Sequence, residues 1–195
     1  MSRKILKTPS ADNIVASVNA AKKGRGLPPV HLWNPPFCGD LDIRIARDGT
    51  WFYLGTPIGR PALVKLFSSI LKREKGKYFL VTPVEKVGII VDDAPFVAVD
   101  FDQIDGDLHF TTHVGDKMIA GPKNPIRIER NELTGEPSPY ILVRSELEAL
   151  IDRKSFYRLV DIGIHKSLDG QSWFGSGFHR TTNPHTGGAG QGRAG

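Results

Sequence analysis

The residues best suited to bind a charged ligand lie where a turn-rich segment leads into an apolar pattern of period 3.6. Thr56, Gly59 and Arg60 precede Pro61, a residue favoured at helix starts. The first amides of a helix lack internal partners and carry the positive end of its dipole, so they attract phosphate or carboxylate groups. Neither Gly59 nor Arg60 has a capping oxygen, and Arg60 adds a guanidinium. The segment predicts an anion site, unless Thr56 or water caps the helix and Arg60 pairs with Asp48 or another surface carboxylate.

Flat and basic side chains near this segment extend the prediction to a nucleotide-type ligand. Trp51 could stack on a base, and Arg44 and Lys86 would add positive charge. Trp51 and Phe52 alternate in an expected strand, so one of the two must face the core whatever the function. We therefore expect Arg60, Gly59, Thr56, Trp51, Arg44 and Lys86 as ligand-binding residues.

A run of carboxylates offers a second chemistry. Asp92, Asp93 and Asp100 are followed by His109 and His113, and carboxylates with imidazoles can bind a divalent metal. On one strand the two histidines would stand about 13 Å apart, which is too far for one ion. We predict neither a metal site nor a cofactor, and a metal-dependent hydrolase using Asp92, Asp93 and Asp100 is the enzymatic alternative.

Composition and charge indicate an ordinary globular protein with a basic amino-terminal arm. The 195 residues are 39% apolar and 24% charged, with a net charge of +5. Six basic residues against one acidic residue lie in positions 1–25, whereas positions 26–180 hold 19 basic and 20 acidic residues. The positive excess therefore sits in the arm, which could contact nucleic acid or an anionic surface weakly or simply aid solubility.

The single cysteine and the hydropathy pattern indicate the cellular compartment of the protein. Cys38 can close no internal disulfide, and it reads as a half-buried structural residue rather than a reactive thiol. No apolar run approaches the roughly 18 residues that span a bilayer, and no secretory signal is evident. We expect a cytoplasmic protein without a transmembrane segment.

Periodicity and turn residues predict an element order that mixes helices and strands. In the first half we expect a helix over residues 10–23, an extended connector over 26–36, strands over 41–46 and 51–54 around the turn Asp48-Gly49, a helix over 61–74 and a strand over 77–82. In the second half we expect strands over 87–91, 96–101, 108–113, 117–120, 126–130 and 140–143.

Two further patterns concern the second half. A two-residue turn at Asp105-Gly106 would place Asp102 opposite His109. Ser145 and Glu148 have the spacing of a capping box, which predicts that the final helix begins at Ser145.

The chain divides into an amino-terminal helix and linker (1–29), an α+β subdomain (30–83), a β-rich subdomain (84–180) and a Gly-rich tail expected to be disordered (181–195). Residues 43–47 and 126–130 share the pattern Ile-Arg-Ile-x-Arg, and each run is followed by an arginine and an expected helix. This similarity favours a duplicated hairpin-helix unit, although any half-buried strand alternates in the same way.

Several separated motifs resemble those of the bacterial family known as domain of unknown function 1285. They are Trp33-Asn34-Pro35, the run from Asp48 to Tyr53, Gly55-Thr56-Pro57-Ile58, Leu66-Phe67, the run from Leu80 to Val87, and the run from Asp92 to Phe96. The resemblance implies a cytoplasmic protein with a duplicated α+β core. Its second half would be pleckstrin-homology-like, a strongly bent antiparallel sheet or partial barrel closed by a helix. The resemblance also implies a nucleotide-type site between the halves and a role in signal transduction, but it supplies no catalytic residues.

The sequence as a whole therefore favours a non-enzymatic module that binds a small anionic, nucleotide-type ligand between two subdomains. The alternatives are the hydrolase and a protein-interaction module that binds a peptide along exposed strand edges.

Overall fold

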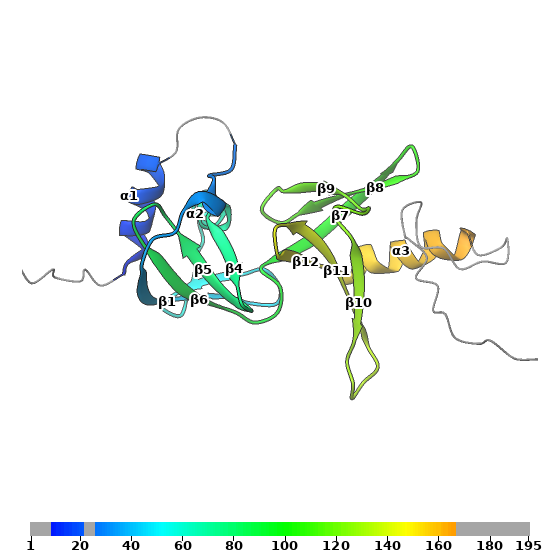
Figure 1. Cartoon of the computed structure of the whole chain (residues 1–195). Helices are drawn as coiled ribbons and strands as arrows, with labels where there is room; N and C mark the ends of the chain where they lie inside the picture. Colours follow the sequence, from blue (N-terminus) through cyan, green and yellow to red (C-terminus); the bar gives the residue numbers. More distant parts are fainter. Residues whose placement is uncertain (1–8, 22–25, 167–195) are drawn as a thin grey trace, which may run out of the picture.

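The computed structural model describes residues 9–21 and 26–166, which fold into two lobes that lie side by side (Figure 1). The N-lobe contains helices α1 and α2 and strands β1 to β6, and the C-lobe contains strands β7 to β12 and helix α3. Helices α1 and α3 lie at opposite ends of the molecule. Each lobe pairs one six-stranded sheet with helices, so the α+β prediction is confirmed.

The N-lobe sheet has the strand order β3-β2-β1-β6-β5-β4. Its elements in chain order are α1 (Ala11–Ala21), a 3₁₀ turn (Val30–Leu32), β1 (Phe37–Ile45), β2 (Trp51–Tyr53), β3 (Thr56–Pro57), α2 (Pro61–Ser69), β4 (Leu71–Glu74), β5 (Lys77–Val81) and β6 (Lys86–Val91). The hydrophobic core of the lobe lies between this sheet and the two helices. Phe67 of α2 and Ile14 and Val18 of α1 are fully buried there.

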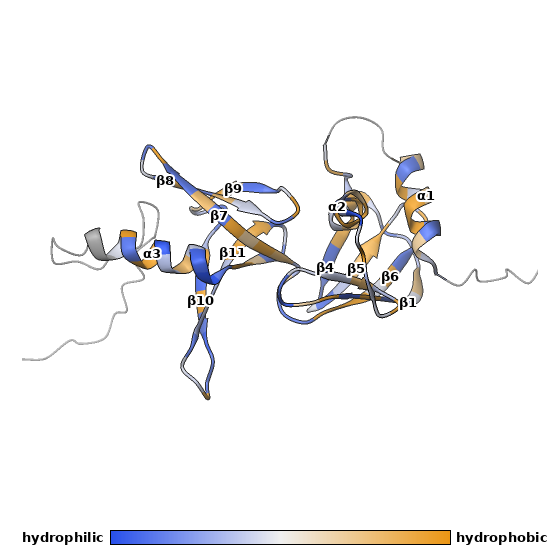
Figure 2. Cartoon of the chain, turned by 180° about the vertical axis from the view of Figure 1, so that it is seen from behind, coloured by the Kyte–Doolittle hydropathy of each residue, from blue (hydrophilic) through white to orange (hydrophobic). Residues whose placement is uncertain are grey.

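The C-lobe sheet has the strand order β10-β11-β12-β7-β8-β9 and curls into a half-barrel. Its elements are β7 (Phe96–Ile104), β8 (Asp107–Thr112), β9 (Lys117–Ile119), β10 (Ile126–Arg130), β11 (Pro137–Arg144), β12 (Leu147–Ile151) and α3 (Arg153–Lys166). Apolar residues run along β7 and β11, and α3 alternates between apolar and polar residues (Figure 2). Helix α3 packs along β7, where Arg158 donates to the carbonyl of Phe101 at 2.8 Å.

The two sheets share one topology, which confirms the duplicated core. In the N-lobe a meander of β1, β2 and β3 is followed by a meander of β4, β5 and β6, and β1 pairs in parallel with β6. In the C-lobe β7 to β12 repeat this order, and β7 pairs in parallel with β12. The equivalent of β10 is therefore the edge strand β4. The shared pattern at residues 43–47 and 126–130 had instead equated β10 with the central strand β1.

Turn residues predicted two hairpins correctly, and for the second of them also the register. The turn that contains Asp48-Gly49 connects β1 to β2 with Ile45 opposite Trp51. Asp105-Gly106 connects β7 to β8, and Asp102 stands opposite His109 as expected.

The predicted helix over residues 61–74 was wrong in its second half. Helix α2 ends at Ser69, where the hydroxyls of Ser68 and Ser69 donate to the carbonyls of Lys65 and Leu66. Residues 71–74 instead form β4, which pairs with β5 across the turn Lys75-Gly76. Both turn residues have positive φ, 50° and 79°, as a tight hairpin of this kind requires.

The predicted helix start at Ser145 was also wrong. Ser145 has a φ of 50° and lies in the turn between β11 and β12. Leu147, Ala149 and Ile151 are buried at alternate positions of β12, the period of a strand. Helix α3 begins at Arg153, and the Asp152 carboxylate caps it by accepting the Ser155 amide at 2.8 Å. The local sequence pattern of β12 fits a helix as well as a strand, and pairing with β11 and β7 makes it a strand.

Hydrogen bonding places β6 in the N-lobe sheet, so the change of lobe follows Val91 rather than residue 83. The end of the predicted helix over 10–23 and the Gly-rich tail over 181–195 lie outside the described residues. Among the helices that the structure describes, none is long and apolar enough to cross a membrane.

Candidate functional site

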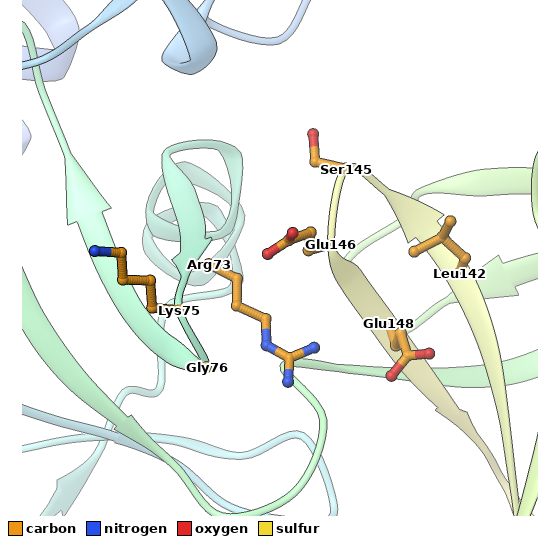
Figure 3. Close-up of a pocket in the computed structure, with 7 residues that line it drawn as sticks. All are labelled: Arg73, Lys75, Gly76, Leu142, Ser145, Glu146 and Glu148. Carbon is orange, nitrogen blue, oxygen red and sulfur yellow. The ribbon is translucent and has the colours of Figure 1, made fainter.

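A groove with a cavity volume of about 630 Å³ lies between the two lobes. Its walls are the β4–β5 hairpin of the N-lobe and the β11–β12 hairpin of the C-lobe (Figure 3). It is lined by Arg73, Lys75, Gly76, Leu142, Ser145, Glu146 and Glu148. Because strand pairing fixes both hairpins, the charged side chains on the two walls are held at the groove by regular structure.

Arg73 is the basic residue of β4 that extends into the groove. Its guanidinium lies over the ring of Tyr78, its cross-strand partner, at 5.6 Å from the ring centroid. Figure 3 shows the side chain reaching into the gap between the hairpins, whereas the ammonium of Lys75 points away from the gap. Within residues 9–21 and 26–166, Arg73 forms no ion pair, and its buried Nε has no hydrogen-bond acceptor.

The C-lobe contains the equivalent of this arginine, in a different electrostatic state. Arg127 of β10 lies over Tyr140 at 4.4 Å, as Arg73 lies over Tyr78. Both oxygens of Glu148 accept from Arg127, at 2.6 Å each, and Glu129 also pairs with Arg127. These hydrogen bonds raise the pKa of Arg127 and lower the pKa of Glu148. One copy of the arginine-tyrosine pair is thus neutralised and the other is not.

The opposite wall of the groove carries carboxylates. Glu146, in the β11–β12 turn, is exposed and has no ion-pair partner among the residues described. Its carboxylate points from the C-lobe toward β4 (Figure 3). Glu148 lies deeper, held by Arg127, and the positive charge of Arg73 adds to the lowering of its pKa. Among the described residues, the lining of the groove thus combines two cations that form no ion pair, Arg73 and Lys75, with the unpaired carboxylate of Glu146.

A second group of polar contacts holds the lobes together beside the groove. Tyr140 donates to Asp93 Oδ1 at 2.8 Å, and Arg47 Nε lies 3.1 Å from Asp93 Oδ2. Arg47 also donates to Ser138 at 2.9 Å. Burial and the Asp93 carboxylate raise the pKa of Tyr140 to about 12. Asp93, in the connection between the lobes, is therefore a structural tie.

The predicted anion site at the start of α2 lies away from the groove. Thr56, Gly59 and Arg60 are exposed, and none of them lines the cavity. Arg60 is the N-cap residue and makes no side-chain cap, as expected. Its carbonyl accepts the amides of residues 63 and 64, and Pro61 has no amide hydrogen, so the first turn keeps only the residue-62 amide for an anion. Asp48 accepts the Thr50 amide and does not pair with Arg60. The anion site at Arg60 stays a prediction.

Three of the other predicted ligand-binding residues have structural roles. Trp51 is only 1% exposed and stacks on Phe67, with the ring centroids 6.2 Å apart, so in this structure it belongs to the core of the N-lobe, and its contact with a ligand stays a prediction. Arg44 pairs with Asp92, and Lys86 pairs with Glu74 at 2.9 Å. Trp51 is buried because its side chain lies on the face of β2 that packs against α2, whereas Phe52 lies on the opposite face.

The carboxylates proposed for a hydrolase are each engaged by a different arginine. Asp92 pairs with Arg44, Asp93 with Arg47 and Asp100 with Arg158. The described residues hold no cluster of three or more His, Cys, Asp or Glu side chains with the geometry of a metal site.

Cys38 is half-buried, and its thiol donates to the carbonyl of Pro36 at 3.4 Å. This contact agrees with the structural role expected for the cysteine.

Sequence reasoning missed Arg73 and Glu146 because both were assigned to helices that the structure replaces with hairpins. The one local signal was Lys75-Gly76, a dipeptide that suits a tight turn and is flanked by Arg73 and Tyr78.

Comparisons with known proteins match this two-lobed architecture. Residues 28–94 match the family model described as "Domain of unknown function (DUF1285), N-terminal domain". Residues 95–177 match "Protein of unknown function (DUF1285), C-terminal domain". The chain therefore belongs to the DUF1285 family, as the sequence motifs indicated.

Two solved structures are similar to this chain. A DUF1285 family protein from Silicibacter pomeroyi DSS-3 is 66% identical, with a TM-score of 0.72, and the match covers 79% of this chain and 86% of that one. A DUF1285 family protein from Shewanella baltica OS155 is 31% identical, with a TM-score of 0.52 and coverage of 62% and 91%. No curated protein matches the chain.

Proposed function

We propose that this protein is a non-enzymatic binding module for a small ligand with an oxyanion group, which enters the groove between the lobes and pairs with Arg73. The single observation that carries the proposal is the state of this arginine. It lines the cavity, its Nε is buried without an acceptor, and it forms no ion pair with a carboxylate of the described residues. A planar guanidinium matches the two oxygens of a carboxylate or phosphate.

The size and rigidity of the groove support the same function. Its volume of about 630 Å³ falls within the range of roughly 300–1,000 Å³ that is usual for small-molecule sites. Arg73 is presented by a paired strand and supported by the ring of Tyr78, so little side-chain freedom is lost when a ligand binds.

The comparison with Arg127 explains why this arginine would serve a ligand. Arg127 has the same cross-strand tyrosine, but two glutamates occupy its donors. In the N-lobe, no glutamate occupies the corresponding donors of Arg73 among the described residues, so these donors can bind the oxyanion of a ligand.

The cytoplasmic location and the role in signal transduction expected from the sequence also belong to this proposal. The basic residues of positions 1–25 would add a weak contact to nucleic acid or an anionic surface. We do not extend the proposal to a hydrolase, because Asp92, Asp93 and Asp100 already serve arginines.

Isothermal titration calorimetry on the full chain, with AMP, ATP, citrate and inorganic phosphate as probes, tests the function. We expect at least one probe to bind, and Arg73→Gln to weaken it about 10- to 100-fold, the usual value of a charge-assisted hydrogen bond. Arg60→Gln is the matched control, since Arg60 is an exposed arginine that does not line the groove.

Three results would contradict the proposal. Unchanged binding in the Arg73 variant would remove the groove from consideration, and loss of binding in the Arg60 variant would locate the site at the start of α2. The absence of binding by every probe would count against an oxyanion site of either kind.

A further inference from the structure

The two walls of the groove carry free charges of opposite sign. Arg73 projects from the N-lobe wall and Glu146 from the C-lobe wall, and both side chains reach into the gap between the hairpins (Figure 3). Neither forms an ion pair with any residue in the described part of the chain. A ligand that fills the groove must therefore face a cation on one side and an anion on the other.

The remaining charges at the groove leave this polarity intact. Both oxygens of Glu148 accept hydrogen bonds from Arg127, so its negative charge is locally compensated. The ammonium of Lys75 points away from the gap and does not neutralise Glu146 (Figure 3). Arg73 and Glu146 are thus the oppositely charged side chains that face the gap without an ion pair in the described part of the chain.

We propose that the ligand of the groove is a small zwitterion that carries a carboxylate or phosphate for Arg73 and a protonated amine for Glu146. This inference rests on the proposed function and names its ligand class. A ligand with only negative groups would gain the contact with Arg73 but would be repelled by Glu146. A ligand with both groups makes two charge-assisted hydrogen bonds.

The neutral lining residues suit the middle part of such a molecule. Leu142 is a half-buried apolar residue at the wall, and Ser145 offers a hydroxyl beside Glu146. Free α-amino acids and short peptides have this arrangement of a carboxylate, an ammonium and a variable side chain. They are the simplest probes of the class.

The test compares each probe with a form that lacks only the positive charge. Ligand-observed NMR with the full chain would first screen the common L-amino acids and their dipeptides, and calorimetry would then measure the best binder and its Nα-acetyl derivative. We expect acetylation to weaken binding about 10- to 100-fold in the unaltered protein, because the contact with Glu146 is lost.

Substitution of the carboxylate should reproduce this loss. Glu146→Gln should bind the free and acetylated forms with nearly equal affinity, and it should bind AMP and phosphate more tightly than the unaltered protein does. Glu146 lies exposed in a turn, so the variant should fold normally. Glu132→Gln, in the exposed turn between β10 and β11, is the control and should change neither affinity.

The possible results separate this inference from the proposed function. If simple anions bind through Arg73 while no zwitterion binds better than its acetylated form, the zwitterion proposal is overturned and the oxyanion site stands. If no probe of either kind binds in a way that depends on Arg73, both proposals fail.

Discussion

His113 of the C-lobe packs directly against Gly49 of the N-lobe. A Cβ atom at residue 49 would lie 3.1 Å from the imidazole Nε2, and the backbone of Gly49 has a φ of 87°, where other residues are strained. The hairpin turn between β1 and β2 thus depends on glycine both for its conformation and for contact between the lobes.

Replacement of Gly49 should therefore destabilise the protein through both effects. Gly55 has a similar φ of 74° but no atom within 4 Å of its Cβ position, so Gly55→Ala isolates the backbone strain, about 1–2 kcal/mol. Gly49→Ala should cost about 1–3 kcal/mol more, because the added methyl group crowds His113 and Val97. Urea unfolding of the two variants measures the difference. Equal losses would show that the lobes do not approach closely at this point.

The same histidine should make stability fall in mild acid. Burial lowers the pKa of His113 below 6.5, its value in an unfolded chain; the backbone contacts with Val97 and Gly49, and then the charges of Asp116 and Asp48, oppose this only partly. Nδ1 accepts the Val97 amide at 3.1 Å, a bond that the protonated ring cannot make. The unfolded chain therefore binds more protons than the folded one as the pH falls through 6.5.

Stability from His113 is thus present above pH 6.5 and is lost below it, by up to about 1.4 kcal/mol per pH unit. Unfolding free energies at about pH 7.5 and about pH 5.5 should differ less in His113→Gln than in the unaltered protein. An identical pH dependence in the two proteins would contradict this role.

Tyr140 should add a dependence on alkaline pH. Its pKa rises from 10.0 to about 12 through burial and the Asp93 carboxylate, so the folded state favours the neutral phenol. The resulting stability is present below pH 10 and is lost as the pH rises through about 12. Burial also raises the pKa of Tyr78, so ultraviolet titration of the phenolates should show late-titrating tyrosines, of which one component disappears in Tyr140→Phe. A titration without such a component would contradict the tie to Asp93.

The start of α3 offers three substitutions with different expected effects. Asp152→Ala removes the cap and should cost about 1 kcal/mol, whereas Asp152→Asn keeps a capping oxygen and should cost little. Ser155 is fully buried, and its hydroxyl has no partner in the described part of the chain. Ser155→Ala should therefore be neutral or stabilising, by up to about 1 kcal/mol. Thermal unfolding checks all three. A large loss in Ser155→Ala would contradict this assignment of the helix start.

The sequence predicted the fold correctly where a local pattern of residues is compatible with only one type of secondary structure. The turns at Asp48-Gly49 and Asp105-Gly106 contain glycine at positions of positive φ, and they predicted both hairpins and the register of the second one correctly. The apolar residues of 145–151 fit a helical face as well as a strand, and only pairing with β11 and β7 decides between the two. The same ambiguity at residues 71–74 concealed β4.

The candidate site was less accessible to sequence reasoning because it forms between elements that are far apart in the chain. Arg44 and Lys86 looked like free cations, but their carboxylate partners Asp92 and Glu74 follow from sheet order. Arg73 differs from Arg127 only in what surrounds it in space. No property of the Arg73 segment by itself indicates that its guanidinium lacks a partner.

The most direct measurement of the central claim is the Nε–Hε resonance of Arg73 in a ¹H–¹⁵N NMR spectrum of the full chain, assigned by its absence in Arg73→Gln. Titration with inorganic phosphate, and then with the best-binding amino acid, should shift this resonance as an oxyanion takes up the guanidinium, while the Arg60 resonance stays in place. If the Arg73 resonance remains unmoved when a ligand binds, the groove between the lobes is not the binding site.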